Sequence, residues 1–252
     1  MSISIKTARE IEKMRRAGEL LEKVHDELGR AIHPGMSTWE INKLGEEMIR
    51  SFGCTPNFLN YNGYPASICV SVNEEVVHGI PSKKRILKEG DIVSLDAGLI
   101  YEGYHSDAAR THAVGEISPE ARKLVEVTRQ AFFEGIKYAK AGNHLHDISN
   151  AIDAYVRPFG YGIVEELVGH GIGHALHEDP QIPNFAQRTK GIRLMPGMTL
   201  AIEPMINIGR PDVEWLDDDW TVVTEDGSLS AHYENTILIT EGEPEILSLT
   251  HR

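Results

Sequence analysis

The sequence predicts an α+β protein, because two helical patterns open the chain, a block of strand patterns follows them, and helices and then strands come again after that. Runs of helices followed by runs of strands are typical of this architecture. The expected helices cover about 7–32, 37–52, 118–140 and 146–158, and the expected strands cover 66–72, 91–114, 199–208, 220–224 and 231–240.

The helices are predicted from their start signals and their apolar spacing. Thr7 and Glu10 form a capping-box pattern, after which apolar residues recur at helical spacing up to the break at 33–35. Ser37 opens a second capping-box pattern. The third helix is expected to begin with Pro119, since proline is favoured at the first helical position.

Composition and charge exclude several classes of protein. The 252 residues carry 25 basic and 38 acidic side chains, a net charge of −13, which argues against nonspecific binding to nucleic acid or anionic membranes. The two cysteines, Cys54 and Cys69, cannot build a disulfide framework or a Cys-rich zinc site. The first residues lack the apolar core of a signal peptide, and no run of 18 apolar residues occurs, so we expect a cytoplasmic protein.

Two aspartates lie where strand patterns disfavour them. Asp96 lies inside VSLDAGLI and Asp107 near the start of SDAARTHAV, although Asp is depleted in strands. If a two-residue turn near 102–103 joins the strands, their odd separation of 11 places both carboxylates on one face, where a cation would relieve their repulsion. The alternative is one surface Asp and one turn Asp, since a three-residue turn without a bulge would split the faces.

Two glutamates repeat this pattern further along the chain. Glu203 falls within the apolar segment TLAIEPMINIG, and Glu234 falls within LSAHYENTILIT. Buried carboxylates are costly unless they are paired or bound to a metal. Four such residues together make a separate explanation for each one less plausible than a shared cation site.

A histidine-rich segment, VGHGIGHALHEDP, spans 168–180. It does not match HExxH, because His177–Glu178 is followed by Asp-Pro-Gln, and its three glycines favour a loop or distorted strand over a helix. In an extended segment His170 and His174 would share a face and His177 would not. Spacing alone therefore does not make all three histidines ligands of one metal.

The ordered set of these residues closely resembles the type I methionine aminopeptidases of the short bacterial type, in peptidase family M24. The resemblance covers roughly 5–245 and rests on NGYPASICVSVNEEVVHGIP, GDIVSLDAG, GYHSDAART, GHGIGHALHEDP, GMTLAIEP and DDDWTVVTEDGSLSAHYENTILIT. It implies a pita-bread fold, in which two pseudo-symmetric halves surround a central metal cleft. It also implies a single catalytic domain over 1–252.

The resemblance implies a metal site with two divalent ions, Mn, Fe or Co with Zn possible, held by Asp96, Asp107, His170, Glu203 and Glu234. Five side chains are too many for one ion with an open position but suit two ions about 3.5–4 Å apart. In the family pattern Asp107 and Glu234 bridge the ions, Asp96 binds one, and His170 and Glu203 bind the other. Glu203 also transfers a proton from the water that the metals activate.

Further residues match the substrate site of the family. His177 matches the residue that stabilises the tetrahedral intermediate, and His78 matches one that contacts the scissile amide. His174 has no matching role, and His232 shares strand parity with Glu234, which allows a place near the site. The methionine pocket is expected from Tyr61, Tyr64, Cys69, Leu176 and Trp220, with Phe58 at its rim, and Asn73 and Ser230 match a monovalent-cation site of some members.

The implied reaction is removal of the initiator methionine from nascent proteins and peptides whose second residue is small. The implied enzyme is a monomer that contacts the ribosome transiently and has no direct specificity for nucleic acid and no membrane attachment. One alternative is an X-Pro aminopeptidase or prolidase, which usually carries an additional N-terminal domain. A second alternative is a non-catalytic binding protein derived from this fold, although such relatives lose metal ligands that are present here.

Overall fold

The computed structural model describes residues 3–249. Among them the helices are α1 (Ala8–Ala31), α2 (Thr38–Ser51), α3 (Pro119–Ile136) and α4 (Leu145–Val156), with 3-10 turns η1 (Tyr61–Gly63) and η2 (Arg157–Phe159). The strands are β1 (Thr55–Pro56), β2 (Ile68–Val72), β3 (Glu75–Val77), β4 (Ile92–Tyr101), β5 (Tyr104–Ala113), β6 (Gly162–Ile163), β7 (Gly169–Gly171), β8 (Glu178–Ile182), β9 (Thr199–Ile202), β10 (Met205–Asn207), β11 (Val213–Trp215), β12 (Val222–Thr224), β13 (Ser230–His232), β14 (Glu234–Leu238) and β15 (Glu245–Ile246).

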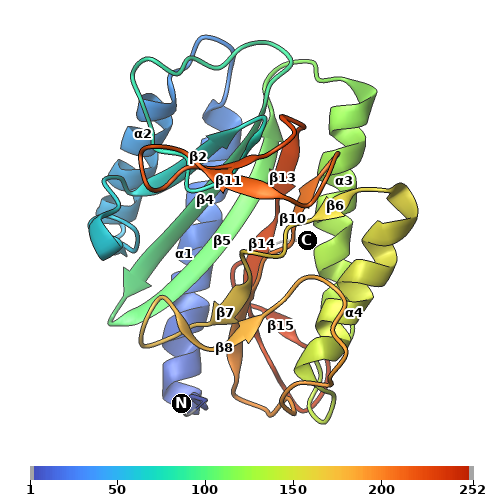
Figure 1. Ribbon diagram of the computed structural model, residues 1–252. Helices are drawn as coiled ribbons and strands as arrows, with labels where there is room; N and C mark the ends of the chain where they lie inside the picture. Colours follow the sequence, from blue (N-terminus) through green and yellow to red (C-terminus); the bar gives the residue numbers. More distant parts are fainter. Residues whose placement is uncertain (1–2, 250–252) are drawn as a thin grey trace.

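One antiparallel sheet runs through the molecule. Its strands follow the order β1-β4-β5-β14-β9-β7-β8, while β2 also pairs with β4 and β15 with β14. Two three-stranded sheets, β13-β10-β6 and β11-β12-β3, lie beside it. Helices α1 and α2 lie on one side of Figure 1 and α3 and α4 on the other, with β4, β5 and β14 between them.

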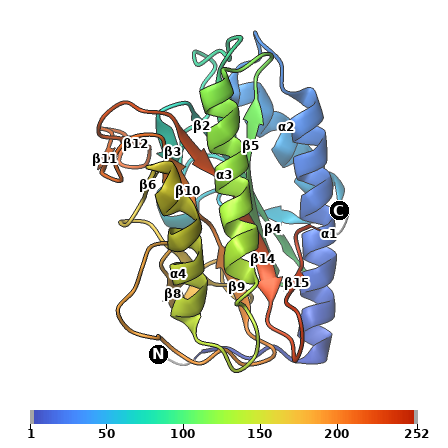
Figure 2. The same cartoon turned by 90° about the vertical axis from the view of Figure 1, so that its right-hand side faces the viewer.

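The two pairs of helices mark two halves with separate cores. In the first half, Leu21 and Val24 of α1 pack with Leu95 of β4 in a fully buried cluster. In the second half, Phe132 of α3 packs in another cluster with Leu200 of β9. Figure 2 shows α3 and α4 side by side over the strands of the second half. The α+β architecture and its two halves agree with the expectation from the sequence.

The helix starts follow the predicted signals. Thr7 and Ser37 each cap a helix through a reciprocal capping box, and Ser118 caps α3, in which proline occupies the first helical position. Helix α3 ends at Ile136, four residues before the expected end, and a turn follows it. The first two helices lie within one residue of the predicted bounds because both of their ends carry clear signals.

The strand predictions succeed best for the β4–β5 hairpin. A two-residue turn joins the strands, and Glu102 and Gly103 both have positive φ, 47° and 84°, as a tight hairpin turn requires. The expected strand 199–208 is instead interrupted after Ile202, and the expected strand 231–240 is interrupted at Tyr233. Glu203 therefore lies in a strand break and Glu234 at a strand start, not in strand centres.

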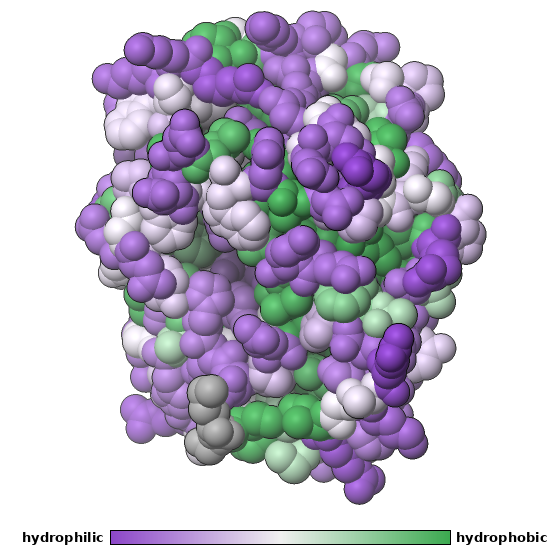
Figure 3. Space-filling model, viewed as in Figure 1, coloured by the Kyte–Doolittle hydropathy of each residue, from purple (hydrophilic) through white to green (hydrophobic). Residues whose placement is uncertain are grey.

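The surface is largely hydrophilic on the face drawn in Figure 3, with hydrophobic residues visible in recesses between polar ones. No helix within 3–249 is long and apolar enough to cross a membrane.

Candidate metal centre and substrate pocket

The β4–β5 hairpin presents the first two candidate ligands. Asp96 pairs with Ala109 and Asp107 pairs with Gly98, so the two carboxylates are diagonal neighbours on one face of the sheet. Gly98 leaves the space that Asp107 occupies, because an added Cβ would lie 3.0 Å from Oδ1 of Asp107. The predicted parity is thus confirmed.

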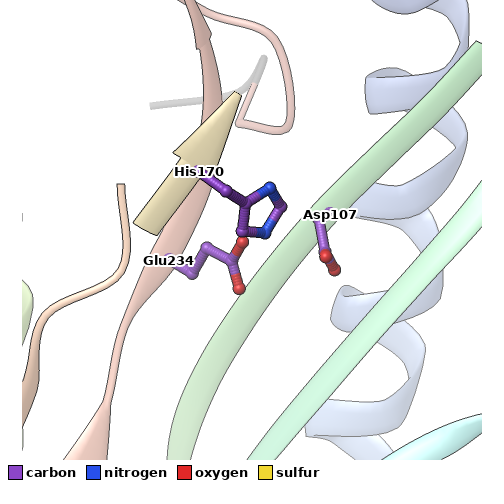
Figure 4. A group of neighbouring side chains, drawn as sticks. All are labelled: Asp107, His170 and Glu234. Atoms are coloured by element: carbon purple, nitrogen blue, oxygen red, sulfur yellow. The ribbon is translucent and has the colours of Figure 1, made fainter. Parts of the chain in front are cut away.

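The second half brings the other candidate ligands to this face. Glu234 opens β14 and pairs with Ala109, which places it beside Asp107. His170 lies on β7, and its Nε2 is 3.5 Å from Oε1 of Glu203. Asp107, His170 and Glu234 offer ligand atoms that all lie within 4.8 Å of one another, and Figure 4 shows these three side chains gathered from β5, β7 and β14.

The tautomer of His170 follows from its partner. Its Nδ1 lies 2.9 Å from the carbonyl oxygen of Gly171, and a carbonyl can only accept, so Nδ1 carries the proton. Burial, and then the neighbouring His177, lower the pKa of His170 to about 3, so the ring is neutral and Nε2 exposes a lone pair. That lone pair faces a carboxylate oxygen of Glu203, an arrangement that a cation between the two atoms would stabilise.

The protein alone does not stabilise the charged form of the clustered carboxylates. Oδ1 of Asp96, Oε1 of Glu203 and Oε1 of Glu234 are buried without a hydrogen-bond partner. Burial raises the pKa of Asp107 to about 7. Burial and then the neighbouring carboxylates raise the pKa of Asp96, Glu203 and Glu234 as well. Orphaned carboxylate oxygens around one imidazole suit divalent cations such as Mn, Fe or Co.

A second group of potential ligand atoms includes a residue that the sequence placed only near the site. Glu203, His232 and Glu234 also gather within 4.8 Å, and Nε2 of His232 lies 3.9 Å from an oxygen of each glutamate. His232 is 1% exposed, and its Nε2 has no hydrogen-bond partner. Asp96 belongs to neither group, although it lies in the same pocket beside Asp107.

The histidine-rich segment is a hairpin, not one extended strand. Strands β7 and β8 pair with a register shift after His170, and the chain turns between them. The rings of His170 and His177 consequently lie 4.3 Å apart, centre to centre. The expectation that His170 and His174 share a face was wrong, because parity fails across a turn. His174 points away, with Nε2 2.7 Å from Glu10, and makes a structural contact.

An ion pair ties the N-terminal segment to this hairpin. Nζ of Lys6 lies 2.5 Å from Oε2 of Glu178, the residue after His177, and the Lys6 side chain is 1% exposed. The other oxygen of Glu178 accepts the backbone N–H groups of His174 and Ala175 at 2.6 and 3.1 Å. Sequence patterns gave no signal for this contact, which spans 172 residues.

All the predicted ligand and substrate residues meet in one pocket of about 670 Å³ that opens to solvent. Its apolar wall includes Tyr64, Cys69 and Leu176, which are buried, and Trp220, whose ring meets Tyr64 edge-on at 5.1 Å. The full lining is Phe58, Tyr61, Asn62, Tyr64, Cys69, His78, Asp96, Asp107, His170, Leu176, His177, Glu203, Trp220 and Glu234. Asn62 is the member that sequence reasoning missed, although its loop is rich in Asn and Gly.

Two histidines line the pocket outside the expected ligand set. Nδ1 of His177 lies 2.8 Å from the hydroxyl of Tyr61, and burial lowers the pKa of His177. His78 has a φ of 59°, and its ring lies 6.2 Å from the ring of Trp220. Burial, and then His177, lower the pKa of His78 to about 4, so both rings are neutral near pH 7.

Asn73 and Ser230, the residues matched to a monovalent-cation site, are joined by a backbone hydrogen bond. The N–H of Ser230 donates to the carbonyl of Asn73 at 2.9 Å. The Asn73 amide is already engaged, since it donates to Asp91 and accepts from the N–H of Ile92. A cation here would therefore have to use backbone oxygens or the hydroxyl of Ser230, which itself donates to the carbonyl of Ile206.

Known proteins match the chain along its whole length. The model of metallopeptidase family M24 matches residues 12–241. A methionine aminopeptidase of Clostridium acetobutylicum is 53% identical, with 98% of this chain and 99% of that protein covered. A crystal structure of methionine aminopeptidase from Thermotoga maritima has a TM-score of 0.96 at 47% identity, covering 98% of this chain and 99% of the other.

A more distant structure represents the alternative activity. An Xaa-Pro dipeptidase from Bacillus anthracis has a TM-score of 0.80 at 27% identity, and the match covers 98% of this chain but 62% of that one. The fold and the carboxylate–imidazole pocket are thus accompanied by full-length similarity to metallopeptidases. The chain belongs to metallopeptidase family M24.

Proposed function

We propose that the protein is a methionine aminopeptidase that removes N-terminal methionine from peptides whose second residue is small. The observation that carries this proposal is the pocket itself, in which a cluster of carboxylates and an imidazole adjoins a short apolar wall. The metal cluster suits hydrolysis of a peptide bond, and the wall of Tyr64, Cys69, Leu176 and Trp220 suits one unbranched apolar side chain.

The divalent metal is assigned to Asp96, Asp107, His170, Glu203 and Glu234, and we infer two ions because five ligands exceed what one ion with an open position needs. The orphaned oxygens of three of these carboxylates, and the Nε2 lone pair of His170, support this assignment. When bound, the metal lowers the pKa of a water and polarises the scissile carbonyl.

Glu203 is assigned as the residue that moves the proton. It lies in a strand break at the cleft, and in the metal-free protein burial followed by the charge of Asp107 raises its pKa. In the proposed reaction Glu203 accepts a proton from the attacking water and returns it to the leaving amine. The pocket opens to solvent on one side, which leaves room for the attacking water and the leaving amine.

His177 is assigned to the developing oxyanion. Its ring is neutral, and Tyr61 engages Nδ1. If the Tyr61 hydroxyl donates this hydrogen bond, the imidazole proton resides on Nε2, which can then donate to the oxygen of the tetrahedral intermediate. His78, a neutral, half-buried residue of the pocket lining, is assigned to the backbone of the scissile amide or the next residue.

The setting of this activity follows from the substrate. We infer a cytoplasmic monomer that acts on the N-terminal methionine of nascent polypeptides and contacts the ribosome transiently. The acidic net charge of −13 supports attraction of substrates with a free amino group over binding to RNA.

A peptide competition tests the proposal. The metal-free protein is supplied with Mn²⁺, Co²⁺ or Fe²⁺ and offered Met-Gly-Met-Met together with an Ala-Pro peptide. We expect cleavage after the first methionine and little reaction at the X-Pro bond. Cleavage only at X-Pro would favour the prolidase group, and no turnover with any metal would favour a binding protein without catalysis.

A further inference from the structure

Few backbone pairs connect the two halves of the molecule beside the proposed metal site. Strands β5 and β14 pair through two residue pairs, Glu234 with Ala109 and Asn235 with Ala108, whereas β4 and β5 pair through ten. Asp107 belongs to the first half and Glu234 to the second, yet both must serve one metal cluster. Backbone pairing alone gives this join little length to fix the position of Glu234.

Arg110 supplies additional contacts at this join. It lies three residues after Asp107 on β5, so its side chain leaves the opposite face of the sheet. Its Nη1 donates to the carbonyl oxygens of Ala109 and Glu234. Its Nη2 donates to Oδ1 of Asn235 at 2.6 Å and to the carbonyl oxygen of Ser248 at 3.3 Å.

The guanidinium also packs on an aromatic ring in the same segment. Its carbon lies 4.6 Å from the ring centre of Tyr233. Arg110 therefore contacts three consecutive residues, 233–235, at the break between β13 and β14 where Glu234 enters the cleft. A planar fork with several donors suits this arrangement, and a lysine could not reproduce it because its ammonium is a single point of contact.

A neighbouring arginine makes no such contacts and offers a comparison. Arg129 of α3 lines the same outer cleft as Arg110 and His112. Its guanidinium lies 4.9 Å from the ring of Phe133, a residue of the same helix. The two arginines thus share charge and line one cleft, but Arg129 is exposed, Arg110 is half-buried, and the contacts to the strand of Glu234 belong to Arg110.

We propose that Arg110 is a positioning residue that holds Glu234 at a fixed distance from Asp107 and so sets the affinity of the cleft for divalent metal. It lies on the face of the sheet opposite to Asp107 and touches neither the pocket nor the substrate. The proposal rests on the metal site of the proposed function but not on the identity of the peptide substrate.

Metal titration tests this role directly. The full-length, metal-free wild type, Arg110→Met and Arg129→Met are titrated with Co²⁺ by calorimetry, and the visible spectrum of bound Co²⁺ is recorded. Because loss of a residue that orients a ligand typically weakens metal binding about 10–100-fold, we expect this loss and an altered spectrum in Arg110→Met. Arg129→Met should bind Co²⁺ as the wild type does.

Two results would overturn the proposal. One is wild-type affinity and spectrum in folded Arg110→Met, and the other is equal weakening in Arg129→Met, which would indicate a general effect of the cleft. If Arg110→Met does not fold, Arg110→Lys decides, with weaker binding at an unchanged melting temperature in support and wild-type binding against. Cleavage of X-Pro peptides by the wild type would refute the proposed function. It would not change the interpretation of the Co²⁺ titration, which does not depend on the peptide substrate.

Discussion

The two halves of the molecule position their proposed metal ligands in different ways. In the first half, Asp96 and Asp107 lie within long, regular strands joined by a two-residue turn, and their positions follow from the alternation of the pleat. In the second half, Glu203 lies between two strands, Glu234 begins one, and His170 sits at a register shift. The first half places its side chains by regular strand pairing, and the second half places its side chains at breaks and shifts in its strands.

This difference shows how each half holds its side chains in the pocket. Ten residue pairs make the β4–β5 hairpin a rigid support for two carboxylates. The broken strands of the second half turn side chains from several directions into one pocket, which a regular strand could not do. The geometry of the second half then depends on glycines, side-chain contacts and the join to β5.

The largest expected effect comes from removing a ligand of the regular half. Asp107→Asn keeps the shape of the side chain but removes the charge that the metal requires, so we expect peptidase activity to fall by about 1000-fold or more, several kcal/mol of transition-state stabilisation. Bound metal, measured by atomic absorption, should fall with it. Asp147→Asn, the same change in the capping box of α4, should leave both unchanged; retained metal in Asp107→Asn would refute its role as a ligand.

Next in size is the loss of a residue of the irregular half that is not a ligand. His177→Ala should lower kcat by about 100–1000-fold, the usual cost of one oxyanion donor, while the metal content stays near that of the wild type. His174→Ala is the matched control, because His174 lies in the same turn but contacts Glu10. Loss of metal from His177→Ala would show that His177 is a ligand instead.

Glycine substitutions compare the two hairpins. An added Cβ at Gly171 would lie 2.2 Å from the backbone oxygen of Asp179, so Gly171→Ala must open the β7–β8 hairpin and should reduce both stability and activity. Gly103 has φ +84° with open space around it, so Gly103→Ala should cost only about 1–2 kcal/mol of backbone strain. Urea denaturation and peptide cleavage measure both effects, and Gly242→Ala, where an added Cβ would make only an ordinary 3.9 Å contact with Oγ1 of Thr240, is the control.

If Gly103→Ala damages activity more than Gly171→Ala, the regular hairpin is not the more tolerant of the two, and the contrast between the halves fails.

The smallest effect is a dependence of stability on pH that both halves share. Burial raises the pKa of Asp107 to about 7 from 3.8, and also raises that of Glu234, so the folded, metal-free protein holds protons that the unfolded chain has released. Between its unfolded and folded pKa, about 4 to 7 for Asp107, each such group should lower the free energy of unfolding as pH rises, by up to about 1.4 kcal/mol per pH unit. Thermal denaturation with a chelator, compared between the wild type and Asp107→Asn, measures this contribution.

The buried histidines act in the opposite direction. The pKa of His170 and of His232 is lowered to about 3, and burial also lowers the pKa of His25, His78, His105, His112 and His177, so these rings take up protons on unfolding as pH falls through about 6.5. The difference between the chelated wild type and chelated Asp107→Asn cancels the histidine contributions, and saturation with Mn²⁺ should remove the carboxylate contribution, because bound carboxylates are already deprotonated. The same pH dependence in the chelated wild type and in chelated Asp107→Asn would contradict the expected protonation of Asp107.

The predictability of the site follows the same division. Capping boxes at Thr7 and Ser37, and the parity of Asp96 and Asp107, are local patterns, and both were predicted correctly from residues alone. Parity failed for His170 and His174 because a turn reverses the chain between β7 and β8. The approach of His177 to His170 was expected only through resemblance to a family.

Contacts between distant segments could not be predicted from the sequence at all. The contacts of Arg110 to residues 233–235 depend on how the halves meet. No local pattern in the chain records that meeting, since the partners are more than a hundred residues apart.

The buried ion pair between Lys6 and Glu178 has a consequence for how the chain can vary. Lys6 also donates its backbone N–H to Gly197, so the N-terminal segment is anchored at two points beside the turn that carries His177. A deletion or fusion that shifts Lys6 would leave the charge of Glu178 buried and release the backbone of His174 and Ala175. Changes in the N-terminal segment and in the turn that carries His177 are therefore constrained to evolve together.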